Sequence, residues 1–326
     1  MRPEPLAEGV VSTGVPARLR TLRITVLAGG AGSEREVSLE SGKAVAGALR
    51  RCGHQVATAD ITPDDTSALD RPEVDIVFIA LHGTFGEDGQ VQRLCEARGV
   101  PYVGSGPEAS ALAMDKDAAK RAFRRAALAT PDWVIVEAAQ ASQERRGLVD
   151  DLALPCVVKP VDGGSSVGIT IARDPASRDE AIERLLGNHG RAMVEAFVPG
   201  REMTVGVLGD RPLPVVEIIP RREFYDYIAK YQDAGTEYIC PAQLPPAVAE
   251  HLRAAGLAAH RALGCRDFSR TDFILADDGT AYVLEVNTIP GFTSHSLLPK
   301  AAAAAGISFE QLCDRIVQLA LERYGR

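Results

Sequence analysis

Three oxygen-bearing side chains, Asp272, Glu285 and Asn287, have the types and spacing of a metal site. Asp272 lies in one apolar run and the other two lie in the next, after an Asp277-Asp278-Gly279 sequence that is typical of a hairpin turn. Residues two apart in a strand face the same side, so Glu285 and Asn287 share a face, and Arg270 shares that of Asp272. Carboxylate and amide oxygens are the ligands that Mg²⁺ prefers, with phosphate oxygens and water completing its octahedron. The set therefore predicts a magnesium site, and solvent-facing polar residues on a half-exposed sheet are the simpler alternative.

A glycine-rich loop, DGGSSVG at 162–168, follows Lys159 and lies between two apolar runs. Successive backbone N–H groups in such a loop can form a nest that binds anions, and phosphate is the natural guest. An ordinary hairpin loop is the alternative, and it would be preferred for a lone glycine-rich segment. Lys159 favours phosphate binding, because a cation beside a nest of N–H groups attracts the negative charge of a bound phosphate.

The same loop also matches G-x-S-x-G at 164–168, the nucleophile elbow of serine hydrolases, with Ser166 in the nucleophile position. An elbow needs a strand, a sharp turn and then a helix. Residues 169–171 are Ile-Thr-Ile, which predicts a strand in place of that helix. A serine hydrolase that uses Ser166 is therefore a remote alternative. The sequence completes neither a Walker A motif nor GxGxxG, so phosphate binding must use another scheme.

Two polar residues and one polar stretch need support from outside their local patterns. Glu34 lies in the turn before a predicted helix, where an acidic side chain by default complements the helix dipole. His82 ends a predicted strand before Gly83, and by default it is a capping or packing residue. The stretch 221–237 is polar and aromatic without a clear period, and loops of that length are usually functional or disordered. We expect it to close over a ligand.

These residues require a scaffold, and the first hundred residues predict a parallel α/β one. An apolar run rich in β-branched residues opens into Gly29-Gly30, and a capping box of Ser33 and Glu36 then starts a helix that Gly53 ends. Strands and helices keep alternating up to about residue 110, which favours a parallel sheet. The predicted strands are 22–28, 55–60, 74–81 and 101–103, and the second helix is 90–98.

Beyond residue 107 the pattern changes to α+β. A helix is predicted at 114–128. The segments 192–198, 202–208 and 214–219 are predicted to be successive antiparallel strands, because Pro-Gly and Gly-Asp turns separate them. The other predicted elements are strands at 133–136, 156–160, 169–172, 267–275 and 281–287, a helix at 246–263 and two closing helices.

Composition excludes several classes of function. The 326 residues carry 36 Lys+Arg and 44 Asp+Glu, a net charge of −8, so nucleic acid is not expected as the main partner. No apolar run approaches the roughly 20 residues of a membrane helix, so no membrane span is expected. Six scattered cysteines and the absence of a secretory signal in residues 1–20 predict a cytoplasmic protein with reduced thiols and a flexible N-terminal arm.

Six blocks of the sequence carry a resemblance to a known family. They are GGAGSEREVSLESG (29–42), LHGTFGEDGQVQ (81–92), PYVGSG (101–106), KPVDGGSSVG (159–168), YDYIAKY (225–231) and LEVNTIPGFTSHSL (284–297). In content and order, across about residues 22–320, they resemble the D-alanine–D-alanine ligase family of the ATP-grasp superfamily. The resemblance implies an ATP-grasp architecture with an N-terminal parallel α/β domain, a central small α+β domain and a C-terminal antiparallel-sheet α+β domain. The implied division is an arm at 1–20 and domains at 21–112, 113–200 and 201–326, with a mobile loop at 221–237.

The resemblance also implies an activity, the ATP-dependent synthesis of D-alanyl-D-alanine for peptidoglycan. The carboxylate of one D-alanine would take the γ-phosphate of ATP, and the amine of a second would attack the acyl phosphate beneath the closed loop. Arg270 and the Gly291 N–H are the implied oxyanion donors, and Glu34 would hold the first ammonium, linked through Ser165 to Tyr231. The other implied contacts are the phosphates of ATP for Lys116, Lys159 and Lys230, adenine for Glu195 and Val198, ribose for Glu202, two Mg²⁺ ions (or Mn²⁺) for Asp272, Glu285 and Asn287, and substrate for His82, Ser296 and Leu297.

Tyr231 bears on the choice of second substrate. In the family resembled, a tyrosine at this place accompanies D-alanine, so we expect the dipeptide in preference to the D-lactate depsipeptide. One alternative is an ATP-grasp ligase that takes D-lactate, D-serine or another amino acid, and another is a non-catalytic ATP-binding sensor. A homodimer is implied by the resemblance alone.

Overall fold

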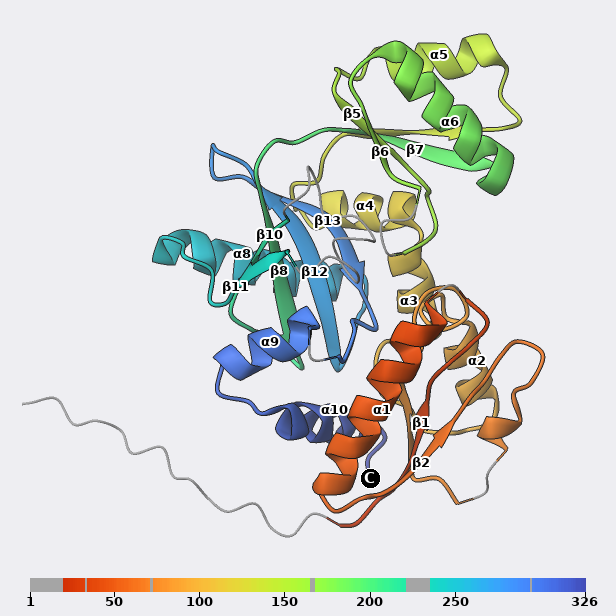
Figure 1. Ribbon diagram of the computed structural model, residues 1–326, viewed down its shortest axis with the longest axis vertical. Helices are drawn as coiled ribbons and strands as arrows, with labels where there is room; N and C mark the ends of the chain where they lie inside the picture. The colour runs from red at the N-terminus through yellow and green to blue at the C-terminus, as the bar shows by residue number, and fades with distance from the viewer. Residues whose placement is uncertain (1–19, 33, 71–72, 165–167, 221–234, 294) are drawn as a thin grey trace, which may run out of the picture.

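The computed structural model describes residues 20–32, 34–70, 73–164, 168–220, 235–293 and 295–326, and these form three β-sheets with helices packed on them (Figure 1). The three sheets occupy successive parts of an elongated molecule. The four-stranded sheet, which comes second along the chain and is called the central sheet below, lies at one end of the molecule. Most of the predicted arm and most of the predicted loop at 221–237 lie outside the described residues. The mixture of parallel α/β and antiparallel α+β structure predicted from the sequence is confirmed.

The N-terminal sheet is parallel, as the alternating pattern predicts. Its strand order is β2-β1-β3, and four of the five residues of β1 are buried. In place of the expected strand at 101–103, Tyr102 forms a single parallel bridge to Val77. The elements are β1 (Arg23–Leu27), α1 (Arg35–Arg51), β2 (Gln55–Ala59), a 3₁₀ helix (Ser67–Leu69), β3 (Ile76–Ile79) and α2 (Gln90–Ala97).

Helix α1 begins one residue later than the predicted capping box places it. Its N-cap is Glu34, which has φ −92° and ψ 12° and whose side chain makes no capping hydrogen bond. Ser33 itself lies outside the described residues. The helix ends as expected, because Gly53 follows it with φ +91°. Glu34 is therefore at the start of α1, but its carboxylate does not cap the helix.

The predicted helix at 114–128 is α4 (Lys116–Arg125), and a helix that was not predicted, α3 (Pro107–Met114), precedes it. They break at Asp115, whose backbone is extended and whose side chain accepts the Ala118 N–H at 2.9 Å. An aspartate that caps a helix competes with continuation of the helix before it. Lys116 is consequently the first residue of α4.

The central sheet is antiparallel, in the order β4-β7-β5-β6. The sequence predicts 192–198 as the neighbour of 202–208, but β7 pairs with β4 and β5, and the chain changes sheets at the Pro199-Gly200 turn. Two helices that were not predicted, α5 and α6, lie together beside this sheet (Figure 1). The elements are β4 (Trp133–Glu137), α5 (Ser142–Asp150), β5 (Cys156–Lys159), β6 (Thr170–Ala172), α6 (Pro175–His189) and β7 (Arg191–Ala196).

The large sheet is also antiparallel, in the order β11-β10-β8-β12-β13, with β9 paired to β8. Helix α8 packs on β8, β12 and β13, with Leu252 and Ala259 fully buried in the shared core. The hairpin of β12 and β13 carries the predicted metal ligands. The elements are β8 (Arg201–Leu208), β9 (Arg211–Pro212), β10 (Val216–Ile219), β11 (Glu237–Ile239), α8 (Pro246–Ala262), β12 (Phe268–Leu275) and β13 (Ala281–Asn287).

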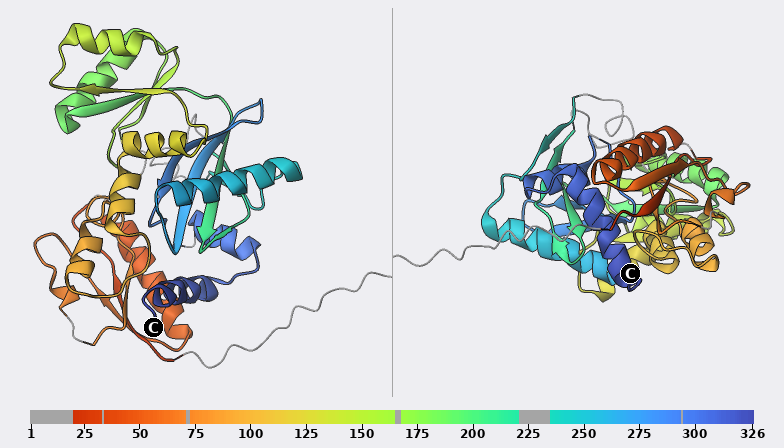
Figure 2. Two further views of the ribbon diagram at one scale, coloured as in Figure 1. Left: turned by 180° about the vertical axis from the view of Figure 1, so that it is seen from behind. Right: turned by 90° about the horizontal axis from the view of Figure 1, so that it is seen from below.

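Two closing helices, α9 (Leu297–Ala304) and α10 (Phe309–Arg323), return the chain to the N-terminal sheet. Figures 1 and 2 show α10 beside α1. One continuous core joins Phe78 of β3 to Phe292, Leu312 and Ile316. The N-terminal sheet thus shares its core with residues more than two hundred positions further along the chain. Among the described residues, no helix is both long and apolar enough to cross a membrane.

Candidate active site

A cavity of about 160 Å³ lies between the central sheet and the large sheet. Its walls are partly apolar, with Val157, Ile171 and Leu284 contributing from three strands. Apolar walls beside lysines are what a ligand with a flat base and anionic phosphates requires. The cavity brings together five of the residues assigned to ATP by resemblance, namely Lys116, Lys159, Glu195, Val198 and Glu202.

Glu195 in β7 is buried between two lysines at this cavity. Its carboxylate accepts a hydrogen bond from Lys159 Nζ at 2.6 Å and another from Lys120 Nζ, and Lys120 also donates to Thr130 Oγ1 at 2.7 Å. Burial opposes ionisation of Glu195, but the two lysines outweigh it and hold the pKa of its carboxyl below the usual value. Burial lowers the pKa of Lys120 to about 8. Lys120 is a buried cation that the sequence analysis did not single out.

Asp272, Glu285 and Asn287 lie side by side on β12 and β13. Asp272 pairs in register with Glu285, and Arg270 pairs with Asn287. Asn287 Nδ2 donates to Asp272 Oδ2 at 3.0 Å, and the Arg270 guanidinium donates to both oxygens of Asp272 at 2.8 and 2.7 Å. Thr204 Oγ1 donates to Asp272 at 2.6 Å.

Two carboxylates and one amide therefore form a compact group with the oxygen donors that Mg²⁺ prefers. Within the described part of the chain, no three His, Cys, Asp or Glu side chains are grouped to hold a metal, so the amide of Asn287 is needed to complete the set. Asp272 has Arg270 as a bidentate partner in this structure. A cation at Asp272 would share this carboxylate with the guanidinium.

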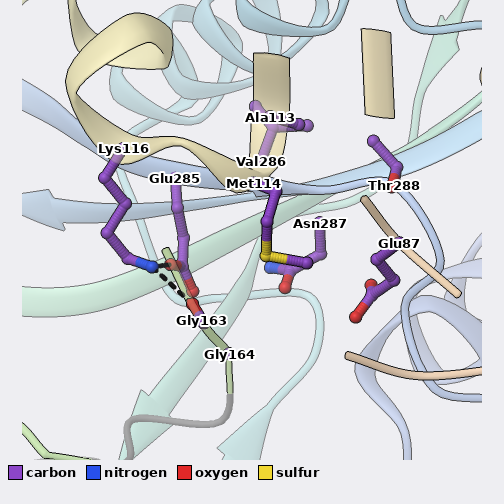
Figure 3. A pocket seen from close by; sticks show the side chains of 10 residues that line it. All are labelled: Glu87, Ala113, Met114, Lys116, Gly163, Gly164, Glu285, Val286, Asn287 and Thr288. Carbon is purple, nitrogen blue, oxygen red and sulfur yellow. Dashed lines mark hydrogen bonds and ion pairs between the residues drawn. The ribbon is translucent and has the colours of Figure 1, made fainter. Parts of the chain in front are cut away.

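Lys116 links the glycine-rich loop to this group. Its Nζ donates to the Gly163 carbonyl at 2.6 Å and lies 3.6 Å from Glu285 Oε2 (Figure 3). The position of Lys116 depends on the break between α3 and α4 at Asp115, which makes Lys116 the first residue of α4. Figure 3 shows the small cavity around these residues, which Asn287 and Glu87 also line.

Glu34 lies against glycines of two other segments. A Cβ at Gly83 would stand 2.4 Å from Glu34 Oε2, and one at Gly164 would stand 3.4 Å from it. Gly83 also has φ +69°, so both its space and its backbone require glycine. Glu87, which the sequence analysis did not single out, accepts the Gly83 N–H at 2.7 Å. Burial, with Glu34 close by, raises the pKa of the Glu87 carboxyl to about 8.

Gly291 lies beside Ser296, where a Cβ would stand 2.6 Å from the serine Oγ. Ser296 is the N-cap of α9, but its hydroxyl makes no capping hydrogen bond and instead contacts Thr293 N and Oγ1 at 3.0 and 2.9 Å. A serine hydroxyl at a helix N-terminus suits a carboxylate ligand. The Leu297 side chain is buried in the core, so any contact of this residue with a ligand falls to its backbone N–H.

Both ring nitrogens of His82 are engaged by the protein itself. Nδ1 faces the Ile289 carbonyl oxygen at 3.1 Å, and Nε2 faces Ser41 Oγ at 3.1 Å. Burial lowers the pKa of His82 to about 4, so the ring is neutral near pH 7. The packing interpretation of His82 fits these contacts better than direct substrate binding does.

Four predicted residues, Ser165, Ser166, Lys230 and Tyr231, lie outside the described residues. The segment after the glycine-rich loop does form strand β6, antiparallel to β5, as the sequence predicts. The helix that a nucleophile elbow requires after Gly168 is therefore replaced by a strand.

Comparison with known proteins connects this geometry to a family. A family profile described as "D-ala D-ala ligase C-terminus" matches residues 122–318, and one described as "D-ala D-ala ligase N-terminus" matches residues 62–105. A D-alanine–D-alanine ligase of Anaeromyxobacter dehalogenans is 46% identical over 295 residues, which cover 90% of this chain and 96% of that protein. The chain belongs to the D-alanine–D-alanine ligase family.

Solved structures of the D-alanine–D-alanine ligase family have the same fold. The ligase of Bacillus anthracis is 36% identical with a TM-score of 0.83, and the match covers 94% of this chain and 99% of that one. A structure of the B. anthracis ligase complexed with ATP is 34% identical with a TM-score of 0.81, and the match covers 94% of this chain and 98% of that one. The VanG D-Ala:D-Ser ligase of Enterococcus faecalis is 31% identical with a TM-score of 0.83, covering 92% and 100%. The ATP-grasp architecture implied by the resemblance is thus confirmed.

Proposed function

We propose that this member of the D-alanine–D-alanine ligase family joins two D-alanines with ATP, through a D-alanyl phosphate, for peptidoglycan precursor synthesis. The observation that carries the proposal is the convergence of Lys116, the glycine-rich loop and the group of Asp272, Glu285 and Asn287 on two adjoining cavities. One cavity has the lining of a nucleotide site. The other is lined by Gly164, and the Glu34 carboxylate beside Gly164 suits an ammonium group.

In the first step a carboxylate oxygen of one D-alanine attacks the γ-phosphorus of ATP, and ADP leaves. Lys116 and Lys159 supply positive charge to the phosphates, and Glu195, Val198 and Glu202 hold the nucleoside. Asp272, Glu285 and Asn287 fit Mg²⁺, and when bound that ion would neutralise phosphate charge. Glu34 holds the ammonium of the first D-alanine, next to Gly83 and Gly164.

In the second step the amine of another D-alanine attacks the acyl carbon, phosphate leaves, and the nitrogen loses a proton. The Arg270 guanidinium and the Gly291 N–H stabilise the oxyanion of the tetrahedral intermediate. Ser296 and the Leu297 N–H, at the start of α9, hold the carboxylate of the second D-alanine. We place Ser165, Lys230 and Tyr231 in the site from the family resemblance alone.

We also propose the domain division at 21–112, 113–200 and 201–326, which is supported by the membership of the strands in three sheets. We propose a cytoplasmic location from the free cysteines and a homodimer from the family resemblance, with D-alanine and ATP as small-molecule partners. Mn²⁺ is expected to replace Mg²⁺, since both take oxygen ligands.

D-Serine as the second substrate is the other candidate, and the similarity to the VanG D-Ala:D-Ser ligase favours it. The same fold at comparable similarity thus accommodates two second substrates among the relatives. Tyr231 leads us to expect D-alanine here.

The test is phosphate release from Mg-ATP by the purified protein, with products identified by mass spectrometry. The substrates are D-alanine alone, L-alanine alone, and D-alanine mixed with D-serine or D-lactate. We expect release with D-alanine alone and D-alanyl-D-alanine as the product. A mixed product that outweighs the dipeptide would reassign the second substrate, and no release with any substrate would favour the ATP-binding sensor.

A further inference from the structure

Residues 289–292, which follow β13, are held at three backbone groups by side chains of the N-terminal part of the chain. The Ile289 N–H donates to Glu87 Oε1 at 3.4 Å, and the Ile289 carbonyl lies 3.1 Å from His82 Nδ1. The Phe292 N–H donates to Ser41 Oγ at 3.2 Å. These contacts come from α1, from the segment between β3 and Gly83, and from the loop before α2.

The contacts form one continuous chain of hydrogen bonds. A carbonyl can only accept, so His82 Nδ1 carries the ring proton and donates it to Ile289. His82 Nε2 is then an acceptor and takes the Ser41 hydroxyl proton, since the two atoms are 3.1 Å apart. The Ser41 oxygen in turn accepts the Phe292 N–H. Each donor in this chain, from the Phe292 N–H through the Ser41 hydroxyl to His82 Nδ1, faces an acceptor. The Ser41 side chain at its centre is fully buried.

The side chains of the same segment are fixed as well. The Phe292 ring is fully buried and packs edge-on against Phe78 at 5.5 Å and against Phe268 at 5.6 Å between centroids. Ile289 is buried in the core of the N-terminal sheet. The segment is therefore anchored on both sides of Gly291 by packing and by hydrogen bonds.

Gly291 is the residue that these anchors leave partly exposed. Among the described residues, no acceptor is paired with its N–H. An amide that is held rigidly by its neighbours and has no acceptor among the described residues suits an oxyanion donor, because a preorganised donor needs no rearrangement when charge develops.

We propose that Ser41, together with His82 and Glu87, is a positioning residue that fixes the Gly291 N–H for the acyl-transfer step. The inference rests on the proposed function for the role of Gly291. Ser41 acts through the backbone of Phe292 and the ring of His82, not through direct contact with substrate or nucleotide.

The decisive variant is Ser41→Ala, which removes the hydroxyl that joins Phe292 to His82. Ser38→Ala is the matched control, because Ser38 is also fully buried on α1 but contacts Gly29 N and the Ala80 carbonyl, each at 2.8 Å. Ser41→Cys keeps a weak donor and acceptor and serves if the alanine variant does not fold. Each protein is measured for kcat, for the KM of ATP, and for amide hydrogen exchange in the peptide that contains residues 289–292.

We expect Ser41→Ala to lower kcat about tenfold with the KM of ATP unchanged, Ser41→Cys to be intermediate, and Ser38→Ala to keep kcat within about twofold. Exchange in the 289–292 peptide should be faster in Ser41→Ala than in Ser38→Ala. Equal kcat and equal exchange in the two alanine variants would overturn the positioning role. If the wild-type protein releases no phosphate with D-alanine, the proposed function fails and the oxyanion role fails with it, while hydrogen exchange still decides whether Ser41 holds the segment.

Discussion

The nucleotide cavity and the 289–292 segment are held in place by different means. At the cavity, charged side chains 2 to 75 residues apart pair with one another: Lys120 and Lys159 with Glu195, and Arg270 with Asp272. At the segment, the side chains of Glu87, His82 and Ser41 in the N-terminal part hold backbone groups 202 to 251 residues away. Disturbing the cavity should therefore affect ATP and phosphate transfer, and disturbing the segment should affect acyl transfer.

The largest effect is expected at Glu285, which lines both cavities. Glu285→Gln keeps the size of the side chain and removes the charge that faces Lys116 and the proposed Mg²⁺. By analogy with other stabilising groups, kcat for phosphate release should fall about 100- to 1000-fold. The control is Glu217→Gln in the same sheet. It removes the carboxylate to which Arg201 donates two hydrogen bonds of 2.7 Å, and Glu217 lines neither cavity. Similar losses of kcat in both variants would mean that charge pairing in this sheet acts through stability.

Lys120 separates the two regions most cleanly. Among the described residues, Lys120→Met leaves the buried Glu195 with Lys159 as its one lysine partner. We therefore expect the KM of ATP to rise about tenfold while the KM of D-alanine stays unchanged. The control is Arg124→Met, because Arg124 stacks on the same Trp133 ring at 4.3 Å and does not contact Glu195. A rise in both KM values, or an equal effect in the control, would contradict a role confined to the nucleotide cavity.

The smallest effect is a pH dependence of stability that arises at Glu87. Its pKa is raised to about 8 by burial, so the folded protein holds a proton that the unfolded chain loses near pH 4.5. This contribution to stability is complete below about pH 4.5 and is lost as the pH rises through about 8. Glu87→Gln cannot titrate, so the Tm of the wild type relative to this variant should fall between pH 5 and 8.5, by at least about 2 °C. Thermal unfolding across that pH range, with the exposed Glu250→Gln as the control, measures the difference. A constant difference in Tm would show that Glu87 does not change protonation there.

The group on β12 and β13 could be predicted because its members are close in the sequence. A hairpin turn and a period of two are enough to bring Asp272, Glu285 and Asn287 together. Lys120 had a weaker signal, since it lies four residues after Lys116 on the same helix, but a lysine on a helix is usually exposed. Ser41 and Glu87 had no local signal for this role, because the segment that they hold lies more than two hundred residues away.

Errors in the predicted elements have physical causes as well. The helix predicted from residue 114 begins at Lys116, because the Asp115 side chain caps α4 and the extended backbone of Asp115 ends α3. Helix α6 carries a capping box of Asp174 and Ser177 with a proline at its start, and the sequence analysis did not use this signal. The sheet to which β7 belongs could not be read from its own residues, because strand pairing is decided by contacts across the whole chain.

The shared core has a consequence for the order in which the chain is synthesised. Val26 and Phe78 of the N-terminal sheet share one core with Leu312 and Ile316 of α10. At typical rates of translation, the ribosome needs roughly 10 to 50 s to reach α10 after completing β3. During that interval the finished strands lack part of their cover, so a nascent chain stalled before residue 309 exposes an apolar face to chaperones.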